Sequence, residues 1–472
     1  MKKCRASCRI AIIGGGASGV AAATRLMENG FCHVQILEAE DYIGGRIRTI
    51  PFADNVADLG AQWCHGMKNN CVYDMVKNLD VVTPTGDFFN DVAMVRSNKE
   101  VVPSELGHKF HEMAFGSMPN DTTPVVGCMG SYLVEHFWKE IEKQIPDVDR
   151  ELAAEFLESF QKHESSIEGS DNLFEISGRG HLEYEECEGD QLVHWRTKGY
   201  ARFLRLLMKV SEDEPSQLGL LNGCVKLGKK VTQIQLLPGR KVQVKCEDES
   251  FKVDHVICTV SLGVLQKDMD TLFSPPLPPA KVNAIRSLRL GTVDKIFFEY
   301  DTHPFPNNFV GFFPLWIEKD LKELRKSKHA WLEGITGIHK ITCQPRVVLA
   351  WVGGVHGRKA ELLTDAEFLE SMQWLFRKFL SFEMPEPKRF MRTKWHQNSN
   401  FRGSYSYRTT TADENNTGPW DLASPIMGEE NHPSLMFAGE ATSRTHFSTV
   451  HGAAEAGWRE ADRLIEYYAI CN

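Results

Sequence analysis

One glycine-rich segment near the amino terminus constrains this chain more than any other feature. A short apolar run, Cys8–Ile13, leads into Gly14-Gly15-Gly16-Ala17-Ser18-Gly19, and an apolar helical pattern continues to Met27. A second strand-like run, His33–Leu37, ends at the acid Glu38, which is placed to accept hydrogen bonds from ribose hydroxyls. A strand, a G-x-G-x-x-G turn, a helix, a strand and an acid form the dinucleotide-binding fingerprint. The sequence therefore predicts a βαβ unit that binds a dinucleotide.

Each position of this fingerprint has a physical role in the predicted unit. Gly14 would make the tight turn, Gly16 would let a pyrophosphate approach the backbone, and Gly19 would let the helix pack closely on the strand. Ala17 and Ser18 begin the helix, where N–H groups without intrahelical partners point toward the phosphates. The glycines alone would also fit a structural turn that binds nothing.

The composition indicates a globular chain of two or three domains. Of its 472 residues, 42% are hydrophobic and 25% are charged, which suffices for a sizeable core. The 54 basic and 63 acidic side chains give a net charge of −9, which disfavours nucleic acid and anionic membranes as partners. The 12 cysteines are scattered and lack zinc-ribbon spacing, so we expect no metal and a reducing compartment.

No targeting or membrane signal stands out in the sequence. The apolar stretch after Lys2 and Lys3 is better explained by the glycine-rich unit than by a signal peptide. No apolar run reaches the length of about 18 residues that a spanning helix needs. The final residues, Ala469–Asn472, are neither a peroxisomal tripeptide nor a hydrophobic anchor. We expect a cytoplasmic monomer.

Motifs along nearly the whole chain resemble those of the flavin-containing amine oxidase superfamily. They include Gly44-Gly45-Arg46, Asp58–Gly66, Thr259–Leu265, Arg402–Tyr407 and Gly439–Ser443. The pattern is most similar to the animal polyamine oxidases, which comprise the N1-acetylpolyamine oxidases and the spermine oxidases. This resemblance implies FAD as the cofactor, with the backbone of Gly45 and the charge of Arg46 beside the pyrophosphate.

The resemblance implies an α/β fold with two domains. A Rossmann-like, double-glycine FAD-binding domain would be assembled from discontinuous segments, residues 1–80, 194–290 and 395–472. An α+β substrate-binding domain would comprise residues 81–193 and 291–394. Amphipathic helical patterns at Tyr132–Gln144 and Arg150–Phe160 fall in that second domain, and a proline-rich crossing is expected at Gln266–Pro279.

The resemblance also implies which residues contact the cofactor. The segment Gly60-Ala61-Gln62-Trp63 would pass over the flavin ring, with Trp395 near it. Val231 would hold the adenine through its backbone. Glu440 would bind the ribityl or phosphate region, and Thr449-Val450 would approach the ring system through the start of the last helix.

Five residues at the reacting end carry the implied chemistry. Lys295 matches a family lysine that holds a water against the flavin N5 atom, and Tyr405 matches a ring that flanks the flavin. Ser404 stands where monoamine oxidases carry a flavin-linking cysteine, so the FAD is expected to be non-covalent. Ser448 and Thr449 replace the second ring of the monoamine oxidase cage, which favours a longer, polar substrate.

The substrate pocket is expected to contain two further groups. His65 would hydrogen-bond a substrate nitrogen. Glu164 would pair with a distal substrate ammonium, and Glu168 is its rival. Tyr200 is expected near the ring system.

The resemblance implies an FAD-dependent polyamine oxidase. It would convert spermine, N1-acetylated polyamines or both, with O2, to a shorter polyamine, an aminoaldehyde and H2O2. An oxidase of amino acids or monoamines, and a flavin-free binding protein of the same fold, remain the alternatives. The choice between acetylated and free polyamines stays open.

Overall fold

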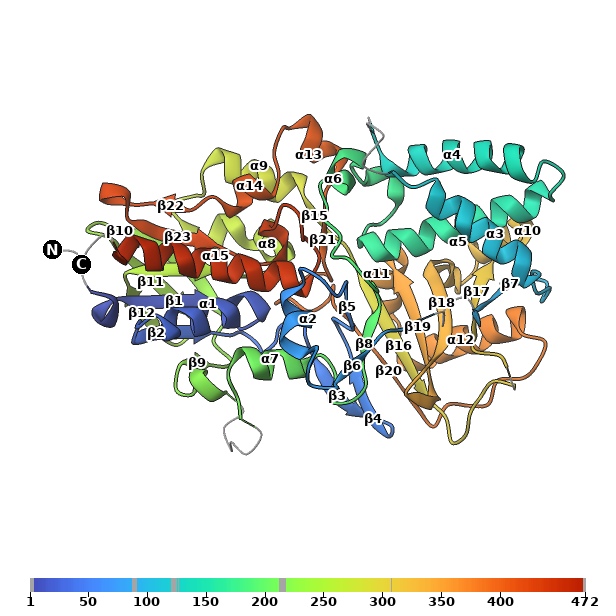
Figure 1. The fold of residues 1–472 in the computed structure, drawn as a ribbon, viewed down its shortest axis with the longest axis horizontal. Coiled ribbons are helices and arrows are strands. Elements are labelled where there is room, and N and C mark those ends of the chain that lie inside the picture. The colour runs from blue at the N-terminus through green and yellow to red at the C-terminus, as the bar shows by residue number, and fades with distance from the viewer. Residues whose placement is uncertain are drawn as a thin grey trace.

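A computed structural model of the protein describes residues 4–86, 91–119, 125, 127–211, 218–306 and 308–469. Figure 1 shows the elements in two groups along the long axis, with β1, β2 and α15 in one and β16–β19 and α5 in the other. Among the described residues, no helix is both long and apolar enough to cross a bilayer.

The predicted glycine-rich unit lies at the centre of a six-stranded sheet in the first group. The strand order is β22-β23-β13-β1-β2-β9, parallel except for the edge strand β22. The strands are β1 (Arg9–Ile13), β2 (His33–Leu37), β9 (Val225–Lys226), β13 (His255–Cys258), β22 (Ile426–Met427) and β23 (Pro433–Phe437). The long helices α1 (Ala17–Glu28) and α15 (Val450–Ala469) pack against each other beside this sheet.

Alternation along the strands explains how this sheet is buried on both faces. Ile10 and Ile12 of β1 face the core formed with α1 and α15, whereas Ala11 and Ile13 face a second core. The second core includes residues of β10 (Val231–Leu237), β11 (Lys241–Cys246), α8 (Leu262–Leu272) and α9 (Pro279–Ser287). Strands β12 (Ser250–Val253) and β14 (Phe273–Ser274) complete its four-stranded sheet.

The expected proline-rich crossing at Gln266–Pro279 is wrong for most of its length. Residues up to Leu272 belong to α8, because Leu265, Met269 and Leu272 recur at helical spacing and face the core. Pro279 is the first residue of α9, where its missing N–H costs nothing.

The second group is built on another six-stranded sheet, of order β20-β16-β19-β18-β17-β7. Its strands are β7 (Ala93–Arg96), β16 (Val293–Glu299), β17 (Gly311–Leu315), β18 (Ile335–Ile341), β19 (Gln344–Gly353) and β20 (Arg389–Arg392). All neighbours are antiparallel except β17 and β7. The helices of this group are α3 (Ser104–Gly116), α4 (Met129–Gln144), α5 (Arg150–Glu168), α10 (Glu318–Leu324), α11 (Gly354–Leu362) and α12 (Asp365–Phe379).

Short elements lie between the two groups in Figure 1. A hairpin of β3 (Thr49–Phe52) and β4 (Asn55–Asp58) packs on one face of β16 and β19. The strands β5 (Trp63–Cys64), β6 (Val82–Thr83) and β8 (Val193–Trp195) form one small sheet, and β15 (Arg289–Leu290) with β21 (Ser406–Tyr407) forms another. The remaining short helices are α2 (Cys71–Val76), α6 (Gly178–Leu182), α7 (Ala201–Leu207), α13 (Thr410–Glu414) and α14 (Pro419–Ala423).

The two large sheets can be compared with the predicted domain boundaries. Every strand of the parallel sheet comes from residues 1–80, 194–290 or 395–472, and every strand of the second large sheet comes from 81–193 or 291–394. The partition itself stays a prediction.

We expect Gly19→Ala to destabilise the protein. The new Cβ would lie 2.0 Å from the carbonyl oxygen of Gly14, so the turn before α1 would have to open. Overpacking of this kind costs about 1–3 kcal/mol, which a fall in melting temperature would report. Gly116→Ala is the matched control, because a Cβ there meets nothing within 4 Å. Equal melting temperatures for the two variants would contradict this account.

Candidate active site

The glycine-rich turn is held against the second glycine pair, Gly44-Gly45. The N–H of Gly44 donates to the carbonyl of Gly15 at 2.9 Å, and a Cβ on Gly45 would lie 3.2 Å from the Cα of Gly16. The space above Gly16 stays open, since a Cβ there would meet nothing closer than 3.8 Å. The buried hydroxyl of Ser18 has no hydrogen-bond partner. An open helix start with an unsatisfied hydroxyl fits a diphosphate.

Glu38 lies at the carboxyl end of β2 and is 5% exposed. One carboxylate oxygen accepts the N–H of Gly15 at 2.6 Å and the other accepts the N–H of Glu40 at 2.8 Å. Burial raises the pKa of this carboxyl. Because a carboxylate can accept about four hydrogen bonds, Glu38 keeps capacity for ribose hydroxyls. The N–H of Lys229 donates to the carbonyl of Glu38. Val231, the residue expected to hold the adenine, begins β10 two residues after this contact.

Arg46 and Glu440 form a half-buried ion pair at 2.8 Å. Arg46 also donates to the carbonyl of Ser404, while Glu440 accepts the hydroxyl of Ser406 at 2.6 Å and the N–H of Ser448 at 3.0 Å. Glu440 is thus occupied by protein groups and positions the Arg46 guanidinium. The cavity beside this pair is lined by residues at the carboxyl ends of β13 and β23, among them Cys258, Val260, Ser261, Gly439 and Glu440.

The two hydroxyls before α15 are used within the protein. The Ser448 hydroxyl donates to the carbonyl of Ser406, and the Ser448 backbone is left-handed, with φ of 69°. Thr449 accepts the N–H of Gly452 at 3.0 Å and thereby caps α15, which begins at Val450. Any hydrogen bond from these hydroxyls to a substrate would have to be shared with these partners.

Lys295 is a buried lysine on β16 with three oxygen acceptors. Its ammonium donates to the carbonyls of Asp58 and Gly60, at 2.9 and 2.7 Å, and to the side-chain oxygen of Gln62 at 2.7 Å. Residues 295, 297 and 299 of β16 share one sheet face, and Phe297 on that face packs against the β3–β4 hairpin. Burial lowers the pKa of Lys295 to about 7, while the charge of Asp58 opposes this shift. A water bound to Lys295 would compete with these three oxygens for the ammonium N–H groups.

One tryptophan ring lies against this ammonium, and two more lie close by in the same region. The ammonium lies 4.7 Å from the ring centre of Trp351, which stacks on Trp63 at 5.2 Å. The indole N–H of Trp395 donates to the carbonyl of Leu59 at 3.3 Å. Ala61 donates its N–H to the carbonyl of Arg46 at 3.1 Å, so the segment expected to cross the flavin contacts the residue expected beside the pyrophosphate.

Trp351 is a site residue that sequence reasoning missed. The sequence predicts the strand that carries Trp351, but it does not reveal the register that pairs Trp351 with Lys295. Tyr200, expected near the ring system, is 2% exposed and packs on Trp195 at 4.9 Å in the core.

Tyr405 contacts the carboxyl-terminal end of α5, the helix that carries Glu164. The Tyr405 hydroxyl donates to the carbonyl of Ser166, and its ring lies against Gly169. Glu164 is 5% exposed, and one of its carboxylate oxygens is buried without a hydrogen-bond partner. Burial, assisted by the charge of Glu168, raises the pKa of Glu164 to about 8.

His65 presents one free ring nitrogen. Its Nδ1 lies 2.8 Å from the carbonyl of Gln191, so Nδ1 carries the proton and Nε2 can accept a hydrogen bond. Burial lowers the pKa of His65, so the ring is neutral at pH 7.

Comparison with known proteins identifies the family. The family model of flavin containing amine oxidoreductases matches residues 17–465, and the chain therefore belongs to this family. Peroxisomal N(1)-acetyl-spermine/spermidine oxidase of Homo sapiens is 29% identical over 98% of this chain and 95% of the relative. Probable polyamine oxidase 5 of Arabidopsis thaliana is 27% identical over 98% of this chain and 99% of the relative.

Solved structures share the fold. A redesigned putrescine oxidase has a TM-score of 0.68 at 16% identity, covering 97% of this chain and 99% of that one. Cyclohexylamine oxidase from Brevibacterium oxydans IH-35A has a TM-score of 0.69 at 17% identity, covering 98% and 99%. The expected α/β fold, the FAD cofactor and the amine oxidase class are confirmed.

We expect Lys295→Met to keep FAD bound but to lower amine turnover about tenfold or more, because an oriented charge in a buried site is lost. Flavin absorbance and peroxide release measure the two effects. Lys322→Met, an exposed lysine on α10, is the control. Full turnover in Lys295→Met would refute a catalytic role for this lysine.

Proposed function

We propose that the chain is a polyamine oxidase that acts on spermine, N1-acetylated polyamines or both. The amine, O2 and water would give a shorter polyamine, an aminoaldehyde and H2O2. Bound FAD would supply the two-electron acceptor for the carbon beside the amine nitrogen. The similarity to enzymes named for N1-acetylspermine and spermidine supports this substrate class.

The observation that carries the proposal is the isolation of Glu164. The other buried acids among the described residues each have a cation or a hydrogen-bond donor as partner. They are Glu38, Glu155, Asp254, Asp294, Glu299, Glu333, Glu361, Glu440 and Glu460. Glu164 has no hydrogen-bond or ion-pair partner among the described residues; the His181 ring favours its charged form, but that ring is hydrogen-bonded to Glu168. An unpaired buried carboxylate is costly. A substrate ammonium would supply the missing partner.

The geometry around Glu164 favours it over its rival. Glu168 contacts Nδ1 of His181 at 3.0 Å, so its charge is already compensated. Glu164 precedes Ser166 by two residues, and Ser166 accepts the hydroxyl of Tyr405. The ring expected to flank the flavin therefore contacts the end of the helix that carries Glu164.

The other residues are assigned roles that fit their contacts. Neutral His65 would accept a hydrogen bond from a substrate nitrogen through Nε2, and Tyr405 would orient the chain of the amine. FAD would be held without a covalent bond, since Ser404 has no thiol and its hydroxyl bonds both backbone groups of Val293.

The net charge supports the expected kind of partner. A net charge of −9 suits a cationic substrate and neither nucleic acid nor an anionic membrane. The monomeric state and the cytoplasmic location stay predictions.

Substrate choice tests the proposal directly. Peroxide release is measured with spermine, N1-acetylspermine, spermidine and a monoamine under identical conditions. We expect at least one of the two proposed polyamine classes to have the highest kcat/KM. A monoamine or an amino acid that exceeds every polyamine would overturn the proposal and favour another amine oxidase.

Glu164→Gln should raise KM for the preferred polyamine about thirtyfold, the equivalent of about 2 kcal/mol for a buried charge pair. The ratio of the variant's KM to the wild-type KM should grow as pH rises toward about 8, because Glu164 must lose its proton to pair with an ammonium. Comparing the two at each pH cancels the titration of the substrate. Glu168→Gln is the control. If it raises KM more than Glu164→Gln does, Glu168 is the partner of the substrate ammonium and Glu164 is not.

A further inference from the structure

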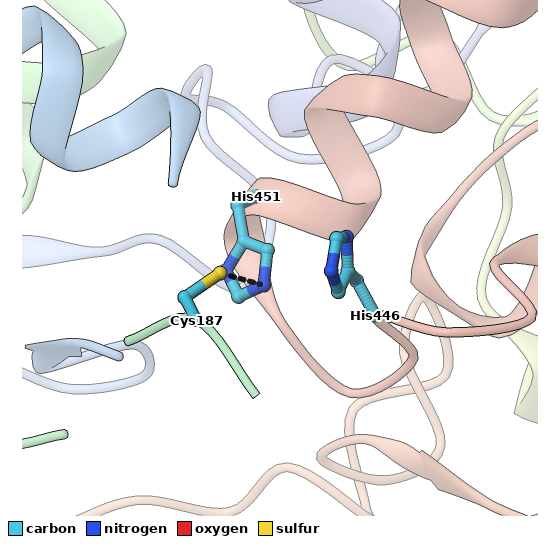
Figure 2. A group of neighbouring side chains, drawn as sticks. All are labelled: Cys187, His446 and His451. Carbon is cyan, nitrogen blue, oxygen red and sulfur yellow. Dashed lines mark hydrogen bonds between the residues drawn. The ribbon is translucent and has the colours of Figure 1, made fainter. Parts of the chain in front are cut away.

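A cysteine and two histidines converge where the last helix begins. Cys187 lies in the loop between α6 and β8, and His446 and His451 flank the start of α15. One ligand atom of each lies within 4.8 Å of the other two. In Figure 2 the Cys187 sulfur points toward the His451 ring, with His446 on the same side of the helix.

The spacing suits a tetrahedral ion. The Cys187 sulfur is 3.9 Å from Nε2 of His451. Zinc–sulfur and zinc–nitrogen bonds of about 2.3 and 2.0 Å would place two such atoms about 3.6 Å apart. A shift of a few tenths of an ångström would therefore bring both atoms onto one ion.

A carboxylate orients one of the rings. Nδ1 of His446 lies 2.7 Å from the carboxylate of Glu455, one turn into α15, which leaves Nε2 to bind an ion. A carboxylate on the distal nitrogen is the usual support of a zinc-binding histidine. Glu455 also raises the pKa of His446, so an ion would compete with a proton here.

The site ties together three chain segments. The N–H of Glu185 donates to the carbonyl of Thr445 at 2.9 Å, so the Cys187 loop already contacts the segment before α15. The Cys187 thiol faces the carbonyl of Asn69 at 3.4 Å, and the Asn69-Asn70 segment lies beside it. The amide nitrogen of Asn70 lies 3.5 Å from Nδ1 of His451, which is a long hydrogen bond. If Nε2 of His451 binds an ion, Nδ1 carries the proton and this weak contact is lost.

We propose that Cys187, His446 and His451 bind one Zn²⁺ that joins the 183–192 loop to the start of α15. One thiolate and two imidazoles are ligands that favour zinc, and a water would complete four-fold coordination. Cys187 and His451 are buried and His446 is partly exposed, so an ion would enter past His446. The sequence alone gives no sign of this group, because its three residues lie far apart in the chain.

The test uses the purified, FAD-loaded protein. It is dialysed against a chelator, given excess Zn²⁺, passed through a desalting column and analysed for metal by mass spectrometry. We expect about one zinc per chain, a higher melting temperature with zinc, and one zinc–sulfur distance of about 2.3 Å in X-ray absorption. No retained zinc, or zinc without a sulfur ligand, would overturn the proposal.

Variants locate the ion. Cys187→Ser should retain no zinc while keeping its flavin absorbance, and Cys32→Ser, an exposed cysteine elsewhere, should bind zinc as the wild type does. Glu455→Gln should weaken zinc binding about tenfold to a hundredfold. Glu466→Gln, an exposed acid on the same helix, should not. Undiminished zinc in Cys187→Ser would refute this ligand set, and if that variant fails to fold, the absorption spectrum of the wild type decides.

Discussion

The Lys295 ammonium links the sheet that contains β16 to the segment of residues 58–62, part of which is proposed to pass over the flavin. It extends from β16 of one sheet to three oxygens of residues 58–62, a segment that also contacts Arg46 beside the glycine-rich turn. A buried ammonium is tolerated only when its protons are all accepted, and here they are. These bonds hold β16 against residues 58–62, and this segment in turn contacts Arg46 beside the glycine-rich turn.

The buried acids of the described residues divide into those that hold the structure and one, Glu164, that lacks a hydrogen-bond or ion-pair partner. Glu440 orders Arg46, Ser406 and Ser448 around the cofactor end of the parallel sheet. Glu164, in contrast, is buried with one carboxyl oxygen that has no hydrogen-bond partner. We propose that the first kind of acid builds the flavin site and that Glu164, once it loses its proton, selects a substrate with more than one amine.

The sequence predicted the parts of this arrangement that depend on local pattern. The fingerprint from Cys8 to Glu38 forms the expected strand, turn, helix and strand, because glycine spacing and apolar alternation are local properties. The register that places Trp351 opposite Lys295 depends on strand pairing across more than fifty residues, so it could not be read from either segment. The same holds for Cys187 and the two histidines, which only the fold brings together. The proline-rich stretch misled because the helical spacing of Leu265, Met269 and Leu272 outweighs the prolines that follow.

Anaerobic reduction of the bound flavin most directly tests whether Glu164 selects a substrate with a second amine. The flavin absorbance is followed after rapid mixing with a polyamine or a monoamine. We predict that a polyamine with a second ammonium reduces the flavin at far lower concentration than a monoamine does. If the concentration that gives the half-maximal rate of flavin reduction is the same for the two amines, the prediction is wrong. The buried carboxylate of Glu164 would then have no part in binding the substrate.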